Sequence, residues 1–291
     1  MQMGSIVERL QRPDTAVPAA PTFVLEPSRA WFALKLKELW VYRELLYFLV
    51  WRDVKVRYKQ TALGVLWVVL QPLLMTLLFS VVFGGFAEIP SDGVPYPIFT
   101  FVALLPWQLF AFALAASSTS LILNQQLITK VYFPRLIVPL AAVLVGIIDF
   151  ATAFLVLLGM MAYYQIALTP AILVLPLLVL LALAVATAVG LWLSALNVQY
   201  RDVQYTIPFL TQFWLFATPI AYPASLIPEQ WQWLYGLNPM VGVVEGFRWV
   251  LLGQIQPLGP SFMVSVAVTM LLLLSGLLYF NRVEKRFADI I

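Results

Sequence analysis

Cysteine and histidine are both absent from the 291 residues of this chain. The chain therefore has no disulfide, no thiolate or imidazole metal ligand, and no cysteine or histidine nucleophile or general base. Charged residues are scarce at 11%, whereas 62% of the residues are apolar and the mean hydropathy is +0.91. Soluble domains carry about 25% charged and roughly 45–50% apolar residues, so this composition excludes a water-soluble globular domain and predicts a membrane protein.

The phosphate-binding loop Gly-x-x-x-x-Gly-Lys-Ser/Thr is also missing, so we expect no ATP hydrolysis by the chain itself. Clusters of metal-ligating residues are missing too, and a net charge of +3 does not indicate a nucleic acid partner. We therefore expect a chain without catalytic residues, metal or bound cofactor. If it moves a substrate uphill, the energy must come from a partner chain or from an ion gradient.

Long apolar runs are abundant, and five of them are long enough to cross a membrane, because a helical span needs about 20 apolar residues. A sixth run is shorter and contains Pro208 and Pro219. The sequence therefore predicts an all-α integral membrane protein with six transmembrane helices. The predicted spans cover about 61–86, 98–123, 136–163, 171–196, 205–222 and 262–280.

The segment 223–252 is apolar but interrupted by prolines, and its longest unbroken piece would rise only about 20 Å as a helix. We expect short re-entrant external helices there, since such segments are tolerated where they pack on protein. With six spans and the N-terminus inside, every Lys and Arg except Arg248 falls on the inner side, as the positive-inside rule requires. Both termini are thus predicted to be cytoplasmic.

The N-terminal part of the chain differs from the six-span domain at 61–291. Residues 1–30 contain four prolines and no apolar run of signal-peptide length, which predicts a disordered cytoplasmic tail. Residues 31–60 predict an amphipathic helix in the membrane interface and then a basic stretch from residue 51. This stretch is either an ordinary anchor or a contact surface for a cytoplasmic partner. Its basic residues are Arg52, Lys55, Arg57 and Lys59.

Asp149 is the acidic residue nearest the middle of a predicted span, where a charge costs at least about 2.5 kcal/mol. It is either a functional proton or sodium site, or a protonated carboxyl that bonds to a neighbouring helix, with Thr152 as a candidate partner. The sequence predicts no Lys or Arg within the spans to pair with it, and no second carboxylate. Both interpretations of this residue stay open.

The fifth predicted span carries aromatic residues and one glutamine within an arc of about 100°. Such a stripe packs against helices or lipid, or it forms a channel wall, because aromatic rings stack on sugars and glutamine bonds to their hydroxyls. Gln71 and Gln108 are polar groups of the same kind in the first two spans. The stripe consists of Tyr205, Phe209, Gln212, Phe213 and Phe216.

Two connections carry unusual side chains. Outside, Trp231, Trp233 and Tyr235 form either an aromatic belt at the headgroups or a gate that contacts carbohydrate. Inside, the loop 124–135 has room for one short helix before Pro134. It either only connects two spans or docks on a partner, because exposed apolar residues usually contact something. The apolar residues that we expect to be exposed are Leu127, Ile128, Val131, Tyr132 and Phe133.

Three segments resemble the membrane subunits of ABC-2 type polysaccharide exporters. The similarity runs from about residue 31 to the C-terminus and is closest to O-antigen exporters, with teichoic acid and capsule exporters nearby. The segments are 57–64 (RYKQTALG) with 66–67 (LW) and 70–73 (LQPL), 132–135 (YFPR), and 238–240 (NPM) with 244–248 (VEGFR).

The resemblance implies a homodimer around a continuous channel in the plasma membrane, which is the inner membrane where the host has an outer one. Two separate ATP-binding cassette subunits would hold ATP and Mg, and the substrate would be a lipid-linked polysaccharide. The loop would couple to the ATPase, residues 51–60 would be a gate, and 223–252 would form the channel exit. The implied coupling residues are Gln125, Leu127, Ile128, Lys130, Tyr132, Phe133 and Arg135. The implied channel lining is Trp67, Gln71, Tyr205, Phe209, Gln212, Phe213 and Phe216, and the implied external gate is Trp231, Trp233, Tyr235, Glu245 and Arg248.

Three other functions remain as alternatives to a polysaccharide exporter. One is an ABC-2 permease for a small lipid or drug, in which the aromatic stripe would face lipid or the helix core. The second is an ion-coupled carrier that uses Asp149, although the sequence has no obvious internal repeat of the kind such carriers often show. The last is a membrane-embedded glycosyltransferase or ligase with Glu229 and Glu245 as its acids, for which the outer loops are small.

Overall fold

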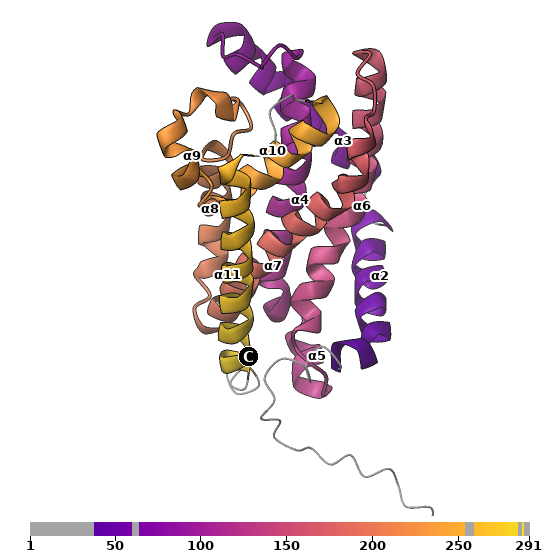
Figure 1. Ribbon diagram of the computed structural model, residues 1–291. Helices are drawn as coiled ribbons and strands as arrows, with labels where there is room; N and C mark the ends of the chain where they lie inside the picture. The colour runs from indigo at the N-terminus through magenta and orange to yellow at the C-terminus, as the bar shows by residue number, and fades with distance from the viewer. Residues whose placement is uncertain (1–37, 60–63, 254–258, 285–286, 288–291) are drawn as a thin grey trace, which may run out of the picture. The chain divides into compact units, whose positions relative to one another are not determined.

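The structure is a computed structural model that describes residues 38–59, 64–253, 259–284 and 287. The chain divides into two units, Met1–Lys37 and Glu38–Ile291, and all of the described residues lie in the second. Every regular element in these residues is a helix (Figure 1). The predicted tail at 1–30 and the first part of the predicted interface helix, residues 31–37, lie outside the described residues.

Within the described residues, five helices are long and apolar enough to cross a membrane. They confirm five of the predicted spans, with ends that differ from the expectation by a few residues. The first consists of α3 (Gly64–Phe79) and a π-helical continuation, η2 (Ser80–Phe86). The other four are α4 (Tyr96–Leu123), α6 (Ile137–Tyr163), η3 with α7 (Pro170–Val174 and Leu175–Gln199), and α11 (Pro260–Val283).

Helix α4 is the central helix, and α3, α6, α7 and α10 pack around it. Small residues let these helices approach closely, as is usual in membrane proteins. A Cβ atom on Gly190 of α7 would lie 2.6 Å from the Ser117 hydroxyl oxygen of α4. A Cβ atom on Gly276 of α11 would lie 2.6 Å from the backbone oxygen of Ala188. Helix α7 therefore packs closely against both α4 and α11.

The fifth predicted span, 205–222, is only partly helical. Helix α8 (Val203–Phe216) has 14 residues, and the chain from Ala217 to Pro223 is not helical. Fourteen residues rise about 21 Å, less than the hydrocarbon core of about 30 Å. Pro219 disfavours a regular continuation of the helix, because it cannot donate a backbone hydrogen bond.

The predicted external segment, 223–252, contains short helices, as expected. They are η4 (Ala224–Leu226), α9 (Glu229–Tyr235) and α10 (Pro239–Leu252). Helix α10 is more deeply embedded than an interfacial helix, because most of its residues are buried between α4, α7 and α11. Its last turn ends at Gly253, whose φ of 64° suits glycine.

Helix α2 (Arg43–Lys59) precedes the first span and packs along α6. The sequence predicts two pieces here with the division near residue 51. The structure instead has one continuous helix through this point, and the interruption lies at Tyr42, between helical residues 38–41 and α2. The side chains of Leu49 and Val54 on α2 are buried and stabilise its packing. Its polar residues therefore lie beside a membrane helix.

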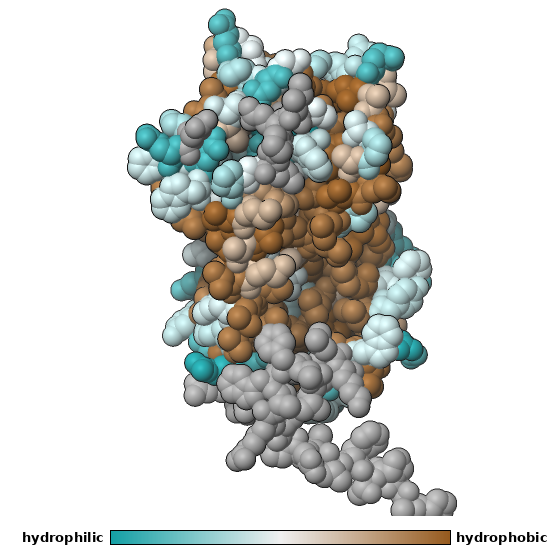
Figure 2. Space-filling model, viewed as in Figure 1, coloured by the Kyte–Doolittle hydropathy of each residue, from teal (hydrophilic) through white to brown (hydrophobic). Residues whose placement is uncertain are grey.

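The surface is apolar over much of the middle of the face drawn in Figure 2, and polar groups gather near α9 and the neighbouring loops. Helix α3 exposes a row of large apolar residues, and α8 exposes an aromatic row. In a membrane these rows must contact lipid or another chain. The rows are Leu66, Trp67, Leu74, Leu77 and Leu78 on α3, and Tyr205, Phe209, Phe213 and Phe216 on α8.

Candidate functional site

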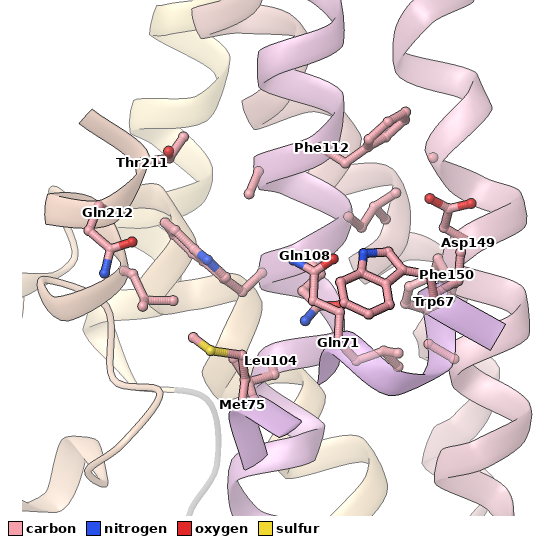
Figure 3. A pocket seen from close by; sticks show the side chains of 18 of the residues that line it. Trp67, Gln71, Met75, Leu104, Gln108, Phe112, Asp149, Phe150, Thr211 and Gln212 are labelled. Atoms are coloured by element: carbon pink, nitrogen blue, oxygen red, sulfur yellow. The ribbon is translucent and has the colours of Figure 1, made fainter. Parts of the chain in front are cut away.

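A cavity of about 410 Å³ opens between α3, α4, α6 and α8. Figure 3 shows three glutamines from three helices around it, Gln71, Gln108 and Gln212. Trp67 and Asp149 line the cavity as well. The structure thus brings together Trp67, Gln71 and Gln212 of the predicted channel lining, and it combines amide, carboxylate and aromatic groups that suit hydroxyl-rich ligands.

The predicted aromatic stripe divides into two faces of α8. Gln212 lines the cavity together with Thr211 and Leu215. The four aromatic members of the stripe do not line this cavity, and each has at least half of its surface exposed. An arc of about 100° was too coarse to separate these faces. The exposed members are Tyr205, Phe209, Phe213 and Phe216.

Asp149 has a basic partner, and it comes from α2, outside the predicted spans in which the sequence offers no Lys or Arg. Arg57 Nη2 lies 2.6 Å from Asp149 Oδ2, and the Tyr58 hydroxyl donates a hydrogen bond to Asp149 Oδ1. Thr152, the candidate partner from the sequence, instead donates to the backbone oxygen of Ile148. The sequence placed Arg57 before the first span, but α2 packs along α6 and carries Arg57 to the middle of that helix.

The Tyr58 hydroxyl remains a proton donor throughout the physiological pH range. Burial raises the pKa of Tyr58 to about 12, and the hydrogen bond to Asp149 adds to the rise. Arg57 also stacks on the ring of Phe112 in α4, with its guanidinium carbon 4.1 Å from the ring centroid. This cation–π contact and the ion pair connect α2 to both α4 and α6.

The other predicted gate residues contact α2 itself or the end of α4. Arg52 bonds to Asp53 at 2.7 Å and to Asn124 Oδ1 at 2.8 Å. Lys55 lies over the ring of Trp51, 5.1 Å from its centroid. Lys55 and Lys59 border a shallow groove of about 340 Å³ along α2.

The inner loop contains the expected short helix, α5 (Gln125–Lys130). Its predicted exposure is only partly correct. Val131 and Tyr132 are exposed, Tyr132 by 78%, but Ile128 and Phe133 are each only 5% exposed. They pack into an apolar cluster with ends of α2, α4, α7 and α11, so they anchor the loop, and the accessible face is polar and aromatic. The exposed residues of the loop are Gln125, Gln126, Thr129, Lys130, Val131 and Tyr132.

Arg135 closes the loop against α11. Its backbone nitrogen lies 3.3 Å from Glu284 Oε1, and its guanidinium donates to the backbone oxygen of Glu284. Leu127 is half-buried beside the same apolar cluster. Loop 124–135 and the end of α11 therefore lie at the same end of the bundle, as Figure 1 shows for α5 and α11.

Arg248, which the resemblance assigns to an external gate, is fully buried. Its guanidinium carbon lies 3.7 Å from the ring centroid of Phe99, and its nitrogens bond to the backbone oxygens of Ile220 and Tyr222 at 3.0 and 3.3 Å. Glu245 Oε1 lies 3.2 Å from Arg248 Nη1. Arg248 thus clamps the non-helical segment after α8 onto α10 and α4.

Asn238 is a further clamp, whose contacts could not be derived from the sequence beyond the signal of a helix cap before Pro239. Its oxygen accepts from the Met240 backbone and from Trp214 Nε1, and its nitrogen donates to Ala217 O at 3.0 Å. Tyr235 is half-buried, and its hydroxyl bonds to Tyr222 at 2.7 Å. Trp231 and Trp233 are exposed.

Among the described residues, no cluster of three or more His, Cys, Asp or Glu side chains could hold a metal ion.

Comparison with known proteins gives a consistent assignment. The family model described as "ABC-2 type transporter" matches residues 44–252. An O-antigen export system permease protein RfbA from Myxococcus xanthus is 32% identical over 258 residues, which cover 87% of this chain and 98% of that protein. RfbA from Klebsiella pneumoniae is 30% identical over 85% of this chain and 95% of the relative. The polysialic acid transport protein KpsM of Escherichia coli is 25% identical over 80% of this chain and 91% of the relative.

The family match and the five apolar helices agree with the resemblance that the sequence motifs indicated. Together they identify a multi-pass inner-membrane protein. The chain belongs to the ABC-2 type transporter family.

Proposed function

We propose that the chain is the permease subunit of an ATP-driven exporter that moves a lipid-linked, O-antigen-like polysaccharide across the inner membrane. The observation that carries this proposal is the 32% identity to an O-antigen export permease over 98% of that relative's length. An ion-coupled carrier built on Asp149 is not favoured, since the carboxylate is paired with Arg57.

The cavity provides the chemistry that a polysaccharide needs inside a membrane. Each hydroxyl transferred from water without a hydrogen-bond partner costs about 1–3 kcal/mol. Gln71, Gln108 and Gln212 supply amide groups that replace water, and Trp67 supplies a ring face for a sugar. In this proposal the complete channel forms between two copies of the chain. The exposed rows on α3 and α8 are the faces we assign to that homodimer contact.

The topology that fits this role has six crossings with both termini inside. Helix α8 and the segment after it would provide the sixth crossing. Asn197 near the end of α7 bonds to Ser118 near the inner end of α4, whereas the Tyr96 hydroxyl at the start of α4 donates to Ala221. The chain between residues 197 and 221 thus runs from one end of α4 toward the other, which supports a crossing by a short helix.

ATP and Mg would be held by two partner ATP-binding cassette subunits. We assign their docking to loop 124–135, whose Tyr132 is 78% exposed on a loop anchored by buried Ile128 and Phe133. Closure of the ATPases would push on α5 and, through the neighbouring α2, change the cavity. Glu245 and Arg248 would hold the external helices at the channel exit, and Trp231 and Trp233 would border it.

The test is co-purification of the chain with its cognate ATPase, followed by measurement of ATP hydrolysis. We expect a complex of two permeases and two ATPases, and we expect Tyr132→Ala to weaken assembly or uncouple ATPase activity by about tenfold, the loss of about 1.4 kcal/mol at an exposed aromatic contact. Tyr200→Ala is the matched control, because Tyr200 is also exposed, by 64%, at the end of α7. Failure of any ATPase to bind the wild-type chain would contradict the proposal.

A further inference from the structure

Helix α2 is fastened to the transmembrane helices at two polar points. At the first, Arg52 bonds to Asn124, the residue that joins α4 to α5. At the second, Arg57 and Tyr58 both contact Asp149 in α6. Arg52 and Arg57 are five residues apart on one helix, a rise of about 7.5 Å, so the two points are rigidly connected.

We propose that the Arg57–Asp149 pair is a latch that holds α2 against the cavity, and that α2 is the lever through which loop 124–135 opens the latch. This inference rests on the proposed function, which assigns the loop to the ATPase. It gives Asp149 a role as a positioning residue in gating rather than as an ion site. Arg57 and Asp149 both line the cavity, so a change in their contact alters the cavity wall.

The position of Asp149 in α6 gives the latch two distinct states, one closed and one open. Asp149 is the thirteenth of the 27 residues of α6, and its side chain is 17% exposed. The Arg57 side chain is more accessible, with 38% of its surface exposed. Separation of the pair would leave the Asp149 carboxylate without its cation near the middle of a membrane helix, which is unfavourable unless the carboxylate gains water or another polar partner. The open position therefore requires a cavity filled with water or with a polar chain. An empty cavity favours the closed position, and this property keeps the path sealed between substrates.

The side chains of the latch are suited to release as a unit. The Arg57 guanidinium contacts Asp149 on α6 and the ring of Phe112 on α4, so it is held from two helices. The Tyr58 hydroxyl occupies the other oxygen of the carboxylate. Lysine at position 57 would keep the charge but lose the planar contact with the ring. When the α4–α5 junction moves, Asn124 pulls on Arg52, and the rigid part of α2 between Arg52 and Arg57 transmits that movement to the contacts with Asp149.

The experiment uses the absence of cysteine from the chain. Ala111 lines the cavity, and Ala111→Cys introduces one thiol whose reaction with a water-soluble maleimide reports opening. The purified permease–ATPase complex is labelled with and without ATP. Four backgrounds are compared with the parent. They are Asp149→Asn, which removes the charge at constant size, the exchanged pair Arg57→Asp with Asp149→Arg, Arg52→Gln, which removes the bond to Asn124, and Asp202→Asn. Asp202 is an exposed carboxylate outside the cavity and serves as the control.

We expect Asp149→Asn to raise the labelling rate without ATP by at least about tenfold, the change that corresponds to a preference of about 1.4 kcal/mol for the closed position. The exchanged pair should return the rate toward the parent value, and Asp202→Asn should leave it unchanged. Restoration by the exchanged pair also excludes simple misfolding as the cause. Arg52→Gln should keep slow labelling without ATP but reduce the acceleration by ATP.

Equal labelling in the parent and Asp149→Asn would overturn the latch, as would failure of the exchanged pair to restore slow labelling in a complex that elutes normally. Transport is measured separately on the same preparations. A latch that responds as expected in a chain that exports no polysaccharide would refute the proposed function and leave the latch standing. Normal export together with equal labelling in the parent and Asp149→Asn would refute the latch and leave the proposed function standing.

Discussion

Replacement of Arg248 by methionine tests the clamp around the external helices. Methionine keeps the length of the side chain but removes the hydrogen bonds to Ile220 and Tyr222, the contact with Phe99 and the pair with Glu245. Removal of one partner from a buried ion pair costs about 3–5 kcal/mol, because the other charge is left uncompensated. At about 2–4 °C per kcal/mol for a chain of this size, Arg248→Met should lower the Tm by roughly 6–20 °C.

The assay is thermal unfolding of the purified permease in detergent, with Arg282→Met as the control. Arg282 is exposed in the last turn of α11, so its replacement should change the Tm little. The double variant Arg248→Met with Glu245→Gln should be more stable than Arg248→Met alone, because it removes the charge left unpaired. An Arg248→Met variant that unfolds within 2 °C of Arg282→Met, about the effect of 1 kcal/mol or less, would refute the clamp.

The effect of Arg248→Met should also depend on pH. Burial raises the pKa of the Glu245 carboxyl, and the charge of Arg248 opposes that rise. Without Arg248 the folded-state pKa rises further above the unfolded value. The folded variant then gains stability from protonation at low pH and loses it as the pH rises through the folded pKa. The Tm difference from wild type should therefore be smaller at pH 5 than at pH 8, and an opposite trend would contradict the assigned pair.

Two further substitutions test helix contacts by the same thermal assay. Gly276→Ala should destabilise by about 1–3 kcal/mol, because the added Cβ would lie 2.6 Å from the Ala188 backbone oxygen, whereas Gly159→Ala meets no atom within 4 Å and should be neutral or slightly stabilising. Equal Tm values would contradict the close approach of α11 and α7. Asn238→Ala should cost about 2–4 kcal/mol, because it removes the cap of α10 and leaves Trp214 Nε1 unpaired. Asn238→Asp keeps the accepting oxygen and should cost less, so an aspartate variant as unstable as the alanine variant would be inconsistent with this role.

The long apolar runs predicted most of the fold, since a run of about 20 apolar residues has few alternatives to a spanning helix. The helices α3, α4, α6, α7 and α11 were identified for this reason. Helix α8 was harder, because apolarity continues through residues 217–222 although Pro219 and the contacts of Asn238 and Arg248 hold that segment in a non-helical form. The composition of such a segment indicates that it lies in apolar surroundings, but it does not indicate which backbone conformation the segment adopts.

The site was less predictable, because its contacts join distant parts of the chain. Sequence placed Arg57 in a basic anchor and Asp149 alone in a span, and 92 residues separate the two that the structure pairs. The packing of α2 along α6, which brings them together, has no local signal. Ile128 and Phe133 illustrate the same limit, since apolar residues on a polar loop can dock on a partner or on the body of their own chain.

ATP-dependent export is the central claim, and delivery of polysaccharide in proteoliposomes tests it most directly. The permease and its ATPase are reconstituted, lipid-linked polysaccharide is supplied on the ATPase side, and its appearance in the lumen is detected with a carbohydrate-specific probe. We predict accumulation that requires ATP, that falls about tenfold in Tyr132→Ala and that stays unchanged in Tyr200→Ala. Polysaccharide that never reaches the lumen, although the complex is assembled and hydrolyses ATP, would contradict the account.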